Sequence, residues 1–178
     1  MGLKDMQAQE IIIQAAESQD LPRLFEISCI VHATNYTELI PDDRKAAFFE
    51  RYKPTNDRRN RYITFVQRKL NQTGYTLFKA IADDGVIVGY LAGEILHDET
   101  YEIRGLFVDP EYQGKGVGTK LVEEAIRKFS AIKMWLFVIE GNRAAIALYK
   151  KYGFEFTNYD IDKTFFGARL LHMSREVM

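Results

Sequence analysis

The sequence contains little cysteine, little proline and no long apolar run. Cys29 is the one cysteine among 178 residues, and there are four prolines. A single cysteine excludes an intrachain disulfide, and the first residues lack the apolar core of a signal peptide, so we expect a cytoplasmic location. Because no apolar run is long enough to span a bilayer, we expect no membrane partner.

Neither sign of charge is in large excess. The formal net charge of -1 gives no general attraction for nucleic acid. A basic stretch contains Arg51, Lys53, Arg58, Arg59 and Arg61. Acidic residues interrupt this stretch, so we interpret it as a solvated helix face and predict no nucleic-acid partner. His32, His97 and His172 are too far apart in the sequence to form a ligand pattern, and we predict no metal site.

The length and the order of the expected elements indicate one α/β (α+β) domain over residues 1–178. The turn Asp83-Asp84-Gly85 between two β-rich runs predicts an antiparallel hairpin. The run 101–108, an amphipathic helix at 121–129 and the apolar run 134–139 predict a right-handed βαβ unit with parallel strands. The expected strands are 11–13, 76–82, 86–96, 101–108, 134–139, one from 154 onward and 169–173. The expected helices run from 20 to about 33, between 41 and 70 with a break at 54–56, over 121–129 and between 142 and 153.

A glycine-rich loop joins the strand 101–108 to the next helix. It carries Gly114, Gly116 and Gly118 within five positions. Glycine has no Cβ and accepts positive φ, so backbone N–H groups can surround an anion at the positive end of the helix. The loop therefore predicts a bound phosphate or pyrophosphate. The alternative interpretation is a tight strand-to-helix turn.

Two other phosphate-binding motifs do not fit this loop. A Walker loop that begins at Gly114 needs a glycine where Thr119 stands, and Gly-Lys-Ser/Thr occurs nowhere in the chain. A dinucleotide fingerprint that begins at Gly116 needs its third glycine where Leu121 stands. A nucleotide-binding protein of either kind is therefore not expected.

Two segments resemble the GNAT acetyltransferase superfamily. Gln113, Gly116 and Gly118 match Gln-x-x-Gly-x-Gly, which resembles the acyl-coenzyme A loop of that superfamily. Asn142 and Tyr149 lie in a segment similar to its second signature, an Asn-x-x-Ala-x-x-x-Tyr helix that ends at Gly-Phe. The resemblance covers residues 76–154. It implies a mixed, mostly antiparallel central sheet with a splayed parallel strand pair, flanked by helices.

The resemblance also implies acetyl-coenzyme A as cosubstrate. The strand before the loop would hold the pantetheine arm, the loop would hold the pyrophosphate, and the second signature would lie at the thioester. The residues assigned in this way are Leu106, Phe107, Val108, Gln113, Gly114, Lys115, Gly116, Val117, Gly118, Thr119, Asn142 and Tyr149.

Acetyl transfer to an amine requires protonation of the leaving thiolate. The resemblance implies that Tyr149 is this general acid, and its spacing from Asn142 puts both on one helix face. A core aromatic and a plain helix cap are the alternative interpretations of the two residues. Cys29 lies outside both signatures, so direct transfer is expected rather than a covalent acyl-enzyme.

Glu102 is the expected base, because some members of the superfamily, notably the histone-acetylating ones, carry a catalytic glutamate on this strand. Glu94 is the second candidate. If no bulge intervenes, strand alternation places Glu102 on the same face as Leu106 and Val108. A surface ion pair with Arg104 is the alternative interpretation of Glu102.

The acceptor has no signature of its own. Four carboxylates cluster around one hairpin, namely Glu94, Asp98, Glu99 and Glu102. They favour a cationic amine, and the pattern resembles bacterial polyamine acetyltransferases. A solvated acidic turn is the alternative interpretation of the same residues. We therefore expect a primary amine of a small molecule, preferably polyamine-like, or of a peptide. A non-catalytic coenzyme A-binding sensor or regulatory module is the alternative, and an exposed strand at 168–173 would allow pairing across a homodimer axis.

Overall fold

An eight-stranded sheet runs through the protein in the order β1-β2-β3-β4-β5-β8-β6, and β7 pairs with β8. The structure is a computed structural model that describes residues 10–158 and 164–177. The strands are β1 (Ile12–Ala15), β2 (Tyr75–Ile81), β3 (Ile87–Ile95), β4 (Tyr101–Val108), β5 (Met134–Ile139), β6 (Glu155–Phe156), β7 (Thr164–Phe165) and β8 (Ala168–Arg175). Every pair is antiparallel except β4 with β5, which are parallel. The predicted fold class is confirmed.

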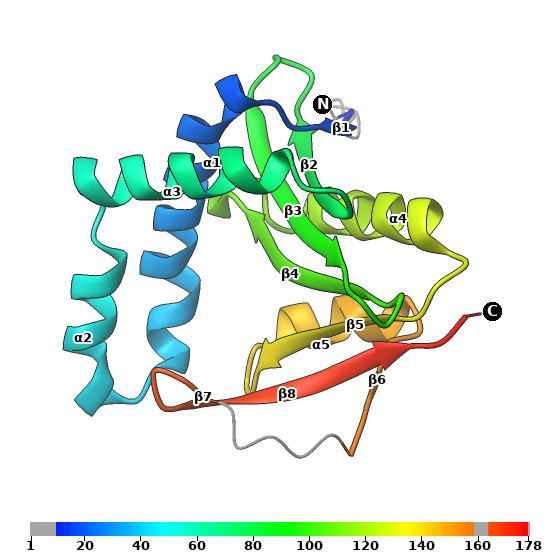
Figure 1. Ribbon diagram of the computed structural model, residues 1–178. Helices are drawn as coiled ribbons and strands as arrows, with labels where there is room; N and C mark the ends of the chain where they lie inside the picture. The colour runs from blue at the N-terminus through cyan, green and yellow to red at the C-terminus, as the bar shows by residue number, and fades with distance from the viewer. Residues whose placement is uncertain (1–9, 159–163, 178) are drawn as a thin grey trace, which may run out of the picture.

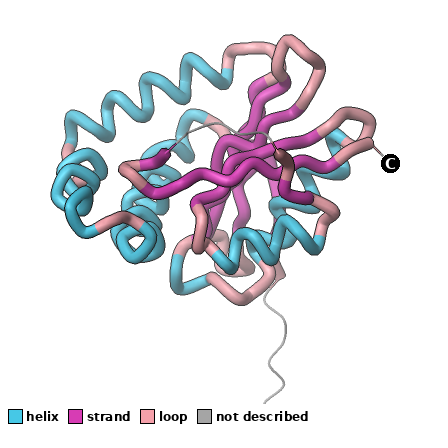
Figure 2. The backbone as a smooth tube through the Cα atoms, turned by 90° about the horizontal axis from the view of Figure 1, so that it is seen from below, coloured by secondary structure: helices cyan, strands magenta, loops and turns pink. Residues whose placement is uncertain are grey.

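Helices cover both faces of the sheet (Figure 1; Figure 2). They are α1 (Leu21–Val31), α2 (Asp42–Tyr52), α3 (Asn56–Leu70), α4 (Val117–Phe129) and α5 (Arg143–Lys151), with a π-helical turn at His32–Tyr36 and 3-10 turns at Ser18–Asp20, Thr37–Leu39 and Pro110–Tyr112. Buried residues of α4 and α5 pack on one face, whereas α1 and α3 pack on the other. A third apolar cluster joins α2 to β7 and the start of β8.

Strand β4 contains a bulge at Arg104. In the pairing with β3, Ala92 lies opposite Gly105 and Gly93 lies opposite Ile103, which leaves Arg104 as the extra residue. A bulge changes which residues share a face and bends the strand. Glu102 therefore does not lie on the face of Leu106 and Val108, as simple alternation would have placed it. Those two residues pack toward α4, and Glu102 lies on the face of α3.

The two parallel strands diverge immediately before this bulge. β4 pairs with β5 from Tyr101 opposite Met134 to Ile103 opposite Leu136. β4 continues to Val108 and β5 to Ile139, but among the described residues no further pairs join them. The backbone of β4 beyond the bulge thus faces a gap in the middle of the sheet.

One expectation about the surface was wrong, and a second holds for four of its five residues, since Arg51, Lys53, Arg59 and Arg61 are exposed. β8 is not an exposed edge, because β5 pairs along one side while β6 and β7 pair along the other. A homodimer through that strand therefore loses its physical basis. Arg58 is not part of a solvated face: its guanidinium lies over the rings of Phe25 and Tyr52, and Nη1 donates to the Tyr52 carbonyl oxygen at 2.6 Å. Arg58 is half-buried because of this cation–π packing, which a charge pattern cannot indicate.

Candidate active site

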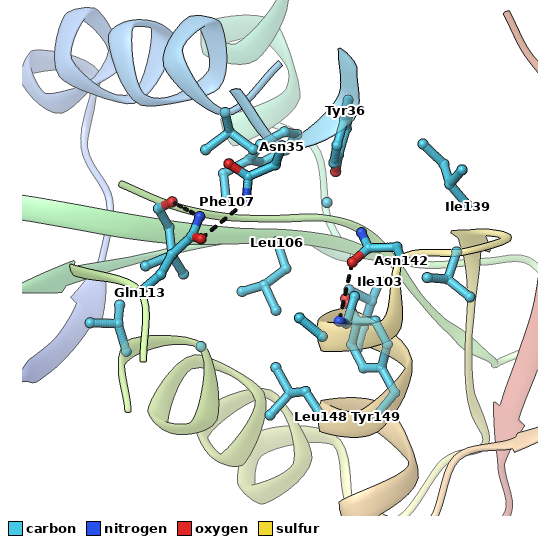
Figure 3. Close-up of a pocket in the computed structure, with 18 of the residues that line it drawn as sticks. Asn35, Tyr36, Ile103, Leu106, Phe107, Gln113, Ile139, Asn142, Leu148 and Tyr149 are labelled. Atoms are coloured by element: carbon cyan, nitrogen blue, oxygen red, sulfur yellow. Dashed lines mark hydrogen bonds between the residues drawn. The ribbon is translucent and has the colours of Figure 1, made fainter. Parts of the chain in front are cut away.

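A cavity of about 720 Å³ opens where β4 and β5 diverge (Figure 3). Its lining falls into two parts. The loop half consists of the β4 backbone at 106–108, the glycine loop and the first two turns of α5. The aromatic half consists of the side chains of His32, Tyr36, Tyr52, Phe107 and Phe165. Of the residues assigned above to the cosubstrate, all but Lys115 line this one cavity.

The glycine loop ends in an open helix N-terminus. Gly114 and Gly116 have φ of +74° and +83°, values that residues with a Cβ rarely adopt. Gly116 is the N-cap of α4 and provides no side-chain hydrogen bond, and the first helical bond runs from the Lys120 N–H to the Gly116 carbonyl at 3.0 Å. The amides of residues 117–119 therefore have no acceptor within the helix. Such amides, at the positive end of the helix dipole, suit an anion.

Gln113 does not hold its side chain free for a ligand. Its Nε2 donates to the Val108 carbonyl at 3.0 Å, and its Oε1 accepts from Asn35 Nδ2 at 3.1 Å (Figure 3). The side chain therefore ties the π-helical turn to the end of β4. Lys115 lies over the Tyr112 ring at 4.7 Å, outside the cavity lining.

Tyr149 and Asn142 lie together at the end of the cavity nearest α5 (Figure 3). Asn142 caps α5, since its Oδ1 accepts from the Ala145 N–H at 3.3 Å. Tyr149 is 6% exposed and lines the cavity, and burial raises its pKa well above the usual value for tyrosine. The nearby Tyr36 hydroxyl adds to this shift, and burial raises the pKa of Tyr36 itself to about 12. Both hydroxyls are therefore protonated near neutral pH.

Glu102 and Glu94 share one cation. Arg104 Nη2 lies 2.8 Å from Glu102 Oε2, and Arg104 Nε lies 3.0 Å from Glu94 Oε2. Glu94 also accepts from Lys69 Nζ at 2.8 Å. Glu102 lines the cavity, whereas Glu94 does not. The ion pair that was the alternative interpretation of Glu102 is therefore present, and it coexists with access to the cavity.

The aromatic half was missed by sequence analysis. The helix expected to end near Ala33 continues as the π-helical turn His32–Tyr36, and π-helical turns often occur at functional sites. Tyr52 comes from the end of α2 and Phe165 from β7. No local motif links these residues, because tertiary packing alone brings them together.

The remaining reactive groups lie elsewhere. Cys29 is buried outside the cavity lining, and burial raises its pKa, so its thiol is protonated near neutral pH. Within residues 10–158 and 164–177, no group of three or more His, Cys, Asp or Glu side chains has an arrangement that could hold a metal ion. In the same described ranges, no helix combines the length and the apolar character that crossing a membrane requires.

Sequence comparison identifies related proteins. The signature of the acetyltransferase (GNAT) family matches residues 37–154. The chain is 27% identical over 145 residues to the ribosomal protein bS18-alanine N-acetyltransferase of Escherichia coli strain K12, a match that covers 80% of this chain and 79% of that protein. It is 36% identical over 83 residues to an uncharacterized N-acetyltransferase of Methanocaldococcus jannaschii and 39% identical over 75 residues to RimI of Mycobacterium tuberculosis. Each of these two matches covers 40% of this chain, and the chain spans only 36% and 47% of the respective relatives.

Known structures share the fold at low sequence identity. PaiA N-acetyltransferase from Thermoplasma acidophilum, crystallised with coenzyme A, superposes with a TM-score of 0.73 at 21% identity, over 94% of this chain and 99% of that one. Mutant forms of the spermidine/spermine N-acetyltransferase SpeG from Vibrio cholerae give a TM-score of 0.68 at 17% identity, over 94% and 95%. At these identities the likeness concerns the fold.

Proposed function

Since the chain belongs to the acetyltransferase (GNAT) family, we propose that it transfers the acetyl group of acetyl-coenzyme A directly to a primary amine. One observation carries the proposal: a single cavity joins the open backbone of β4, the uncapped start of α4 and the hydroxyl-bearing side chain of Tyr149. The β4 backbone suits the amide-rich pantetheine arm, the start of α4 suits the pyrophosphate at one end of that arm, and Tyr149 suits the departing sulfur at the other end. We propose a cytoplasmic, single-domain enzyme.

In this proposal the loop half binds by backbone rather than by side chains. Leu106, Phe107 and Val108 offer strand backbone to the arm, in the position that a neighbouring strand would otherwise occupy. Residues 113–119 surround the pyrophosphate, and the Lys115 ammonium supplies positive charge from outside the cavity. Gln113 acts through the Val108 carbonyl and Asn35, which keeps the loop in place.

The chemical step is aminolysis of a thioester. The amine nitrogen attacks the acetyl carbon, the C–N bond forms, and collapse of the tetrahedral intermediate breaks the C–S bond. Tyr149 donates a proton to the leaving sulfur, and its raised pKa guarantees that the proton is present at neutral pH. The same burial makes a free tyrosinate costly, so donation accompanies C–S cleavage rather than preceding it. Asn142 caps α5 and thereby fixes the helix that carries Tyr149.

Glu102 is the proposed base. The amine loses a proton as the C–N bond forms, and a carboxylate in the cavity lining can accept it through a water molecule. The Glu102 carboxylate is paired with Arg104 at 2.8 Å and reaches the amine only through water, so we expect a modest contribution. Glu94 lies beyond Arg104 and outside the cavity lining, which makes it the weaker candidate.

The acceptor proposed from the sequence was polyamine-like or peptidic. SpeG, a spermidine/spermine acetyltransferase by name, supports the first only at the level of fold, and the Escherichia coli relative, named for a ribosomal protein, supports the second. The charge argument for a polycation is weaker than the sequence suggested. Asp98 Oδ1 accepts hydrogen bonds from the N–H and the hydroxyl of Thr100 in the same turn. Of the four clustered carboxylates, only Glu102 lines the cavity.

The experiment is release of free thiol from acetyl-coenzyme A over a panel of amines, with mass spectrometry of the acetylated product. Tyr149→Phe separates an enzyme from a coenzyme A-binding sensor. We expect about a thousandfold lower kcat with unchanged coenzyme A affinity, because only proton donation is lost. Unchanged turnover would remove the acid assignment. Tight coenzyme A binding without turnover on any amine would favour the sensor.

A further inference from the structure

The aromatic half of the cavity is built around His32. The imidazole stacks on Tyr52 with centroids 3.9 Å apart, and Phe107 lies 5.4 Å from it. Tyr36 and Phe165 complete the wall at 5.1 Å and 6.5 Å from the same ring. These side chains come from the π-helical turn, α2, β4 and β7, and all of them line the cavity.

This wall contains no free charge. Among the described residues that line the cavity, Glu102 and Arg104 are the only charged side chains, and they are paired with each other at 2.8 Å. A second ammonium group on an acceptor would therefore leave water without a carboxylate to receive it. The cost of burying an unpaired ammonium is larger than the gain from a cation–π contact with these rings, so its burial remains unfavourable. An aromatic or branched apolar group, in contrast, gains favourable contacts with the rings.

The size of the cavity also limits the acceptor. The whole space is about 720 Å³, and the pantetheine arm with its acetyl group must share it with the acceptor. Ligand pockets of this size hold small molecules. The acceptor that fits the aromatic half is therefore compact.

We infer that the aromatic half is the acceptor site, and that its acceptor is a small primary amine carried on an aromatic or apolar body rather than a polyamine. This inference rests on the proposed acetyl transfer, because it names the acceptor of that reaction. The side chains that select the body are Tyr52, Phe107 and Phe165.

His32 supplies the polar contact for the amine. Its Nδ1 lies 2.5 Å from the Ser28 carbonyl and donates to it, since a carbonyl only accepts. The other ring nitrogen, Nε2, is then unprotonated and accepts a hydrogen bond from the amine. Burial lowers the pKa of His32 to about 4, so the ring is neutral at neutral pH. The hydrogen bond to the Ser28 carbonyl opposes this lowering of the pKa only in part, and the nearby positive Arg58 adds to it, while Tyr36 and Tyr52 stay protonated. His32 is thus a positioning group that receives a neutral amine.

The test compares two amines that differ by one group. Pentylamine and 1,5-diaminopentane have the same carbon chain, but only the second carries another ammonium. We expect kcat/KM at least a hundredfold higher for pentylamine, and higher again for 2-phenylethylamine. Titration calorimetry of 2-phenylethylamine without acetyl-coenzyme A measures the acceptor site independently of turnover.

Two neighbouring phenylalanines provide a matched pair of variants. Phe165 lines the cavity, whereas Phe166 lies behind it, in contact with Phe48, Tyr52 and Phe165, and does not line the cavity. Phe165→Leu should raise KM for 2-phenylethylamine about tenfold and leave KM for pentylamine within threefold. Phe166→Leu should change neither KM. Thermal unfolding of both variants shows whether each retains its fold.

The possible outcomes test the acceptor site and the proposed acetyl transfer separately. Faster acetylation of 1,5-diaminopentane than of pentylamine would overturn the inference and leave the proposed function standing. Binding of 2-phenylethylamine with no turnover of any amine would support the acceptor site and contradict the proposed function. Acetylation confined to a peptide such as Phe-Gly-Gly would overturn the inference, because the acceptor would then be a chain terminus.

Discussion

The loop half and the aromatic half of the cavity share strand β4, but they present different parts of the chain to a ligand. The loop half presents backbone: the edge of β4 beyond the bulge and the first amides of α4. The aromatic half presents side chains from four separate elements. Backbone binding requires glycine at fixed spacing, whereas a wall of rings requires only bulk and shape. The first is therefore recognisable in a sequence, and the second is not.

The largest expected effect is a loss of coenzyme A affinity from a substitution that blocks the loop half alone. Gly116 and Gly85 both have φ of +83°, and a Cβ on either would meet no atom within 4 Å. Gly116→Trp and Gly85→Trp therefore carry the same backbone strain, about 1–2 kcal/mol. Only the first places an indole in the glycine loop. We expect at least a thousandfold loss of coenzyme A affinity for Gly116→Trp and none for Gly85→Trp, measured by calorimetry.

The control measurement is ligand binding to the aromatic half of the cavity. Binding of 2-phenylethylamine should be the same in both glycine variants, because the rings lie apart from the loop. Equal loss of coenzyme A affinity in the two variants would mean that strain, not access to the loop, is responsible.

An intermediate effect is expected from His32 in the aromatic half, as a pH dependence of the free energy of unfolding. The pKa of His32 is about 4 when folded and about 6.5 in an unfolded chain, so the unfolded state binds more protons between these values. The stability that this group contributes is complete above pH 6.5 and is lost as the pH falls toward 4. The difference amounts to about 3 kcal/mol.

The measurement is urea unfolding of the protein and of His32→Phe at several pH values from 7 to 4. The variant keeps an aromatic ring but has no titrating group, so its unfolding free energy should decline less by about 3 kcal/mol. His97→Phe, on an exposed turn, serves as the control for replacement of a histidine. Parallel curves for all three proteins would show that His32 is not held neutral by burial.

The smallest expected effect lies at the junction of the two halves. Glu102→Gln should lower kcat/KM about tenfold, because a base that acts through water contributes modestly. Glu94→Gln should have less effect, since Glu94 shares Arg104 but does not line the cavity. The comparison is made from pH–rate profiles of both variants. A larger effect for Glu94→Gln would indicate that Glu94, rather than Glu102, is the base.

The same contrast explains what sequence analysis could predict. The hairpin at Gly85, the parallel pair around α4 and the two signatures depend on local turn chemistry and periodicity, and the structure has them all. A bulge in this strand was named as the condition on its alternation, but its position at Arg104 was not predicted, because nothing in the local sequence distinguishes a bulged arginine from a paired one. The position of Arg58 as a half-buried cation over two rings was not predicted either, because it depends on the packing of α3 against α1 and α2.

The bulge makes the cavity sensitive to the length of β4. Removal of Arg104 would leave Ile103 and Gly105 adjacent, and the two residues already lie opposite neighbours on β3. Every other side chain of β4 would then keep its present face. The bend would disappear, however, and β4 would be free to pair with β5 beyond Ile103 and Leu136. A one-residue deletion would thus give a more regular sheet with no room for a ligand, so substitutions at this position are compatible with the cavity while a change in strand length is not.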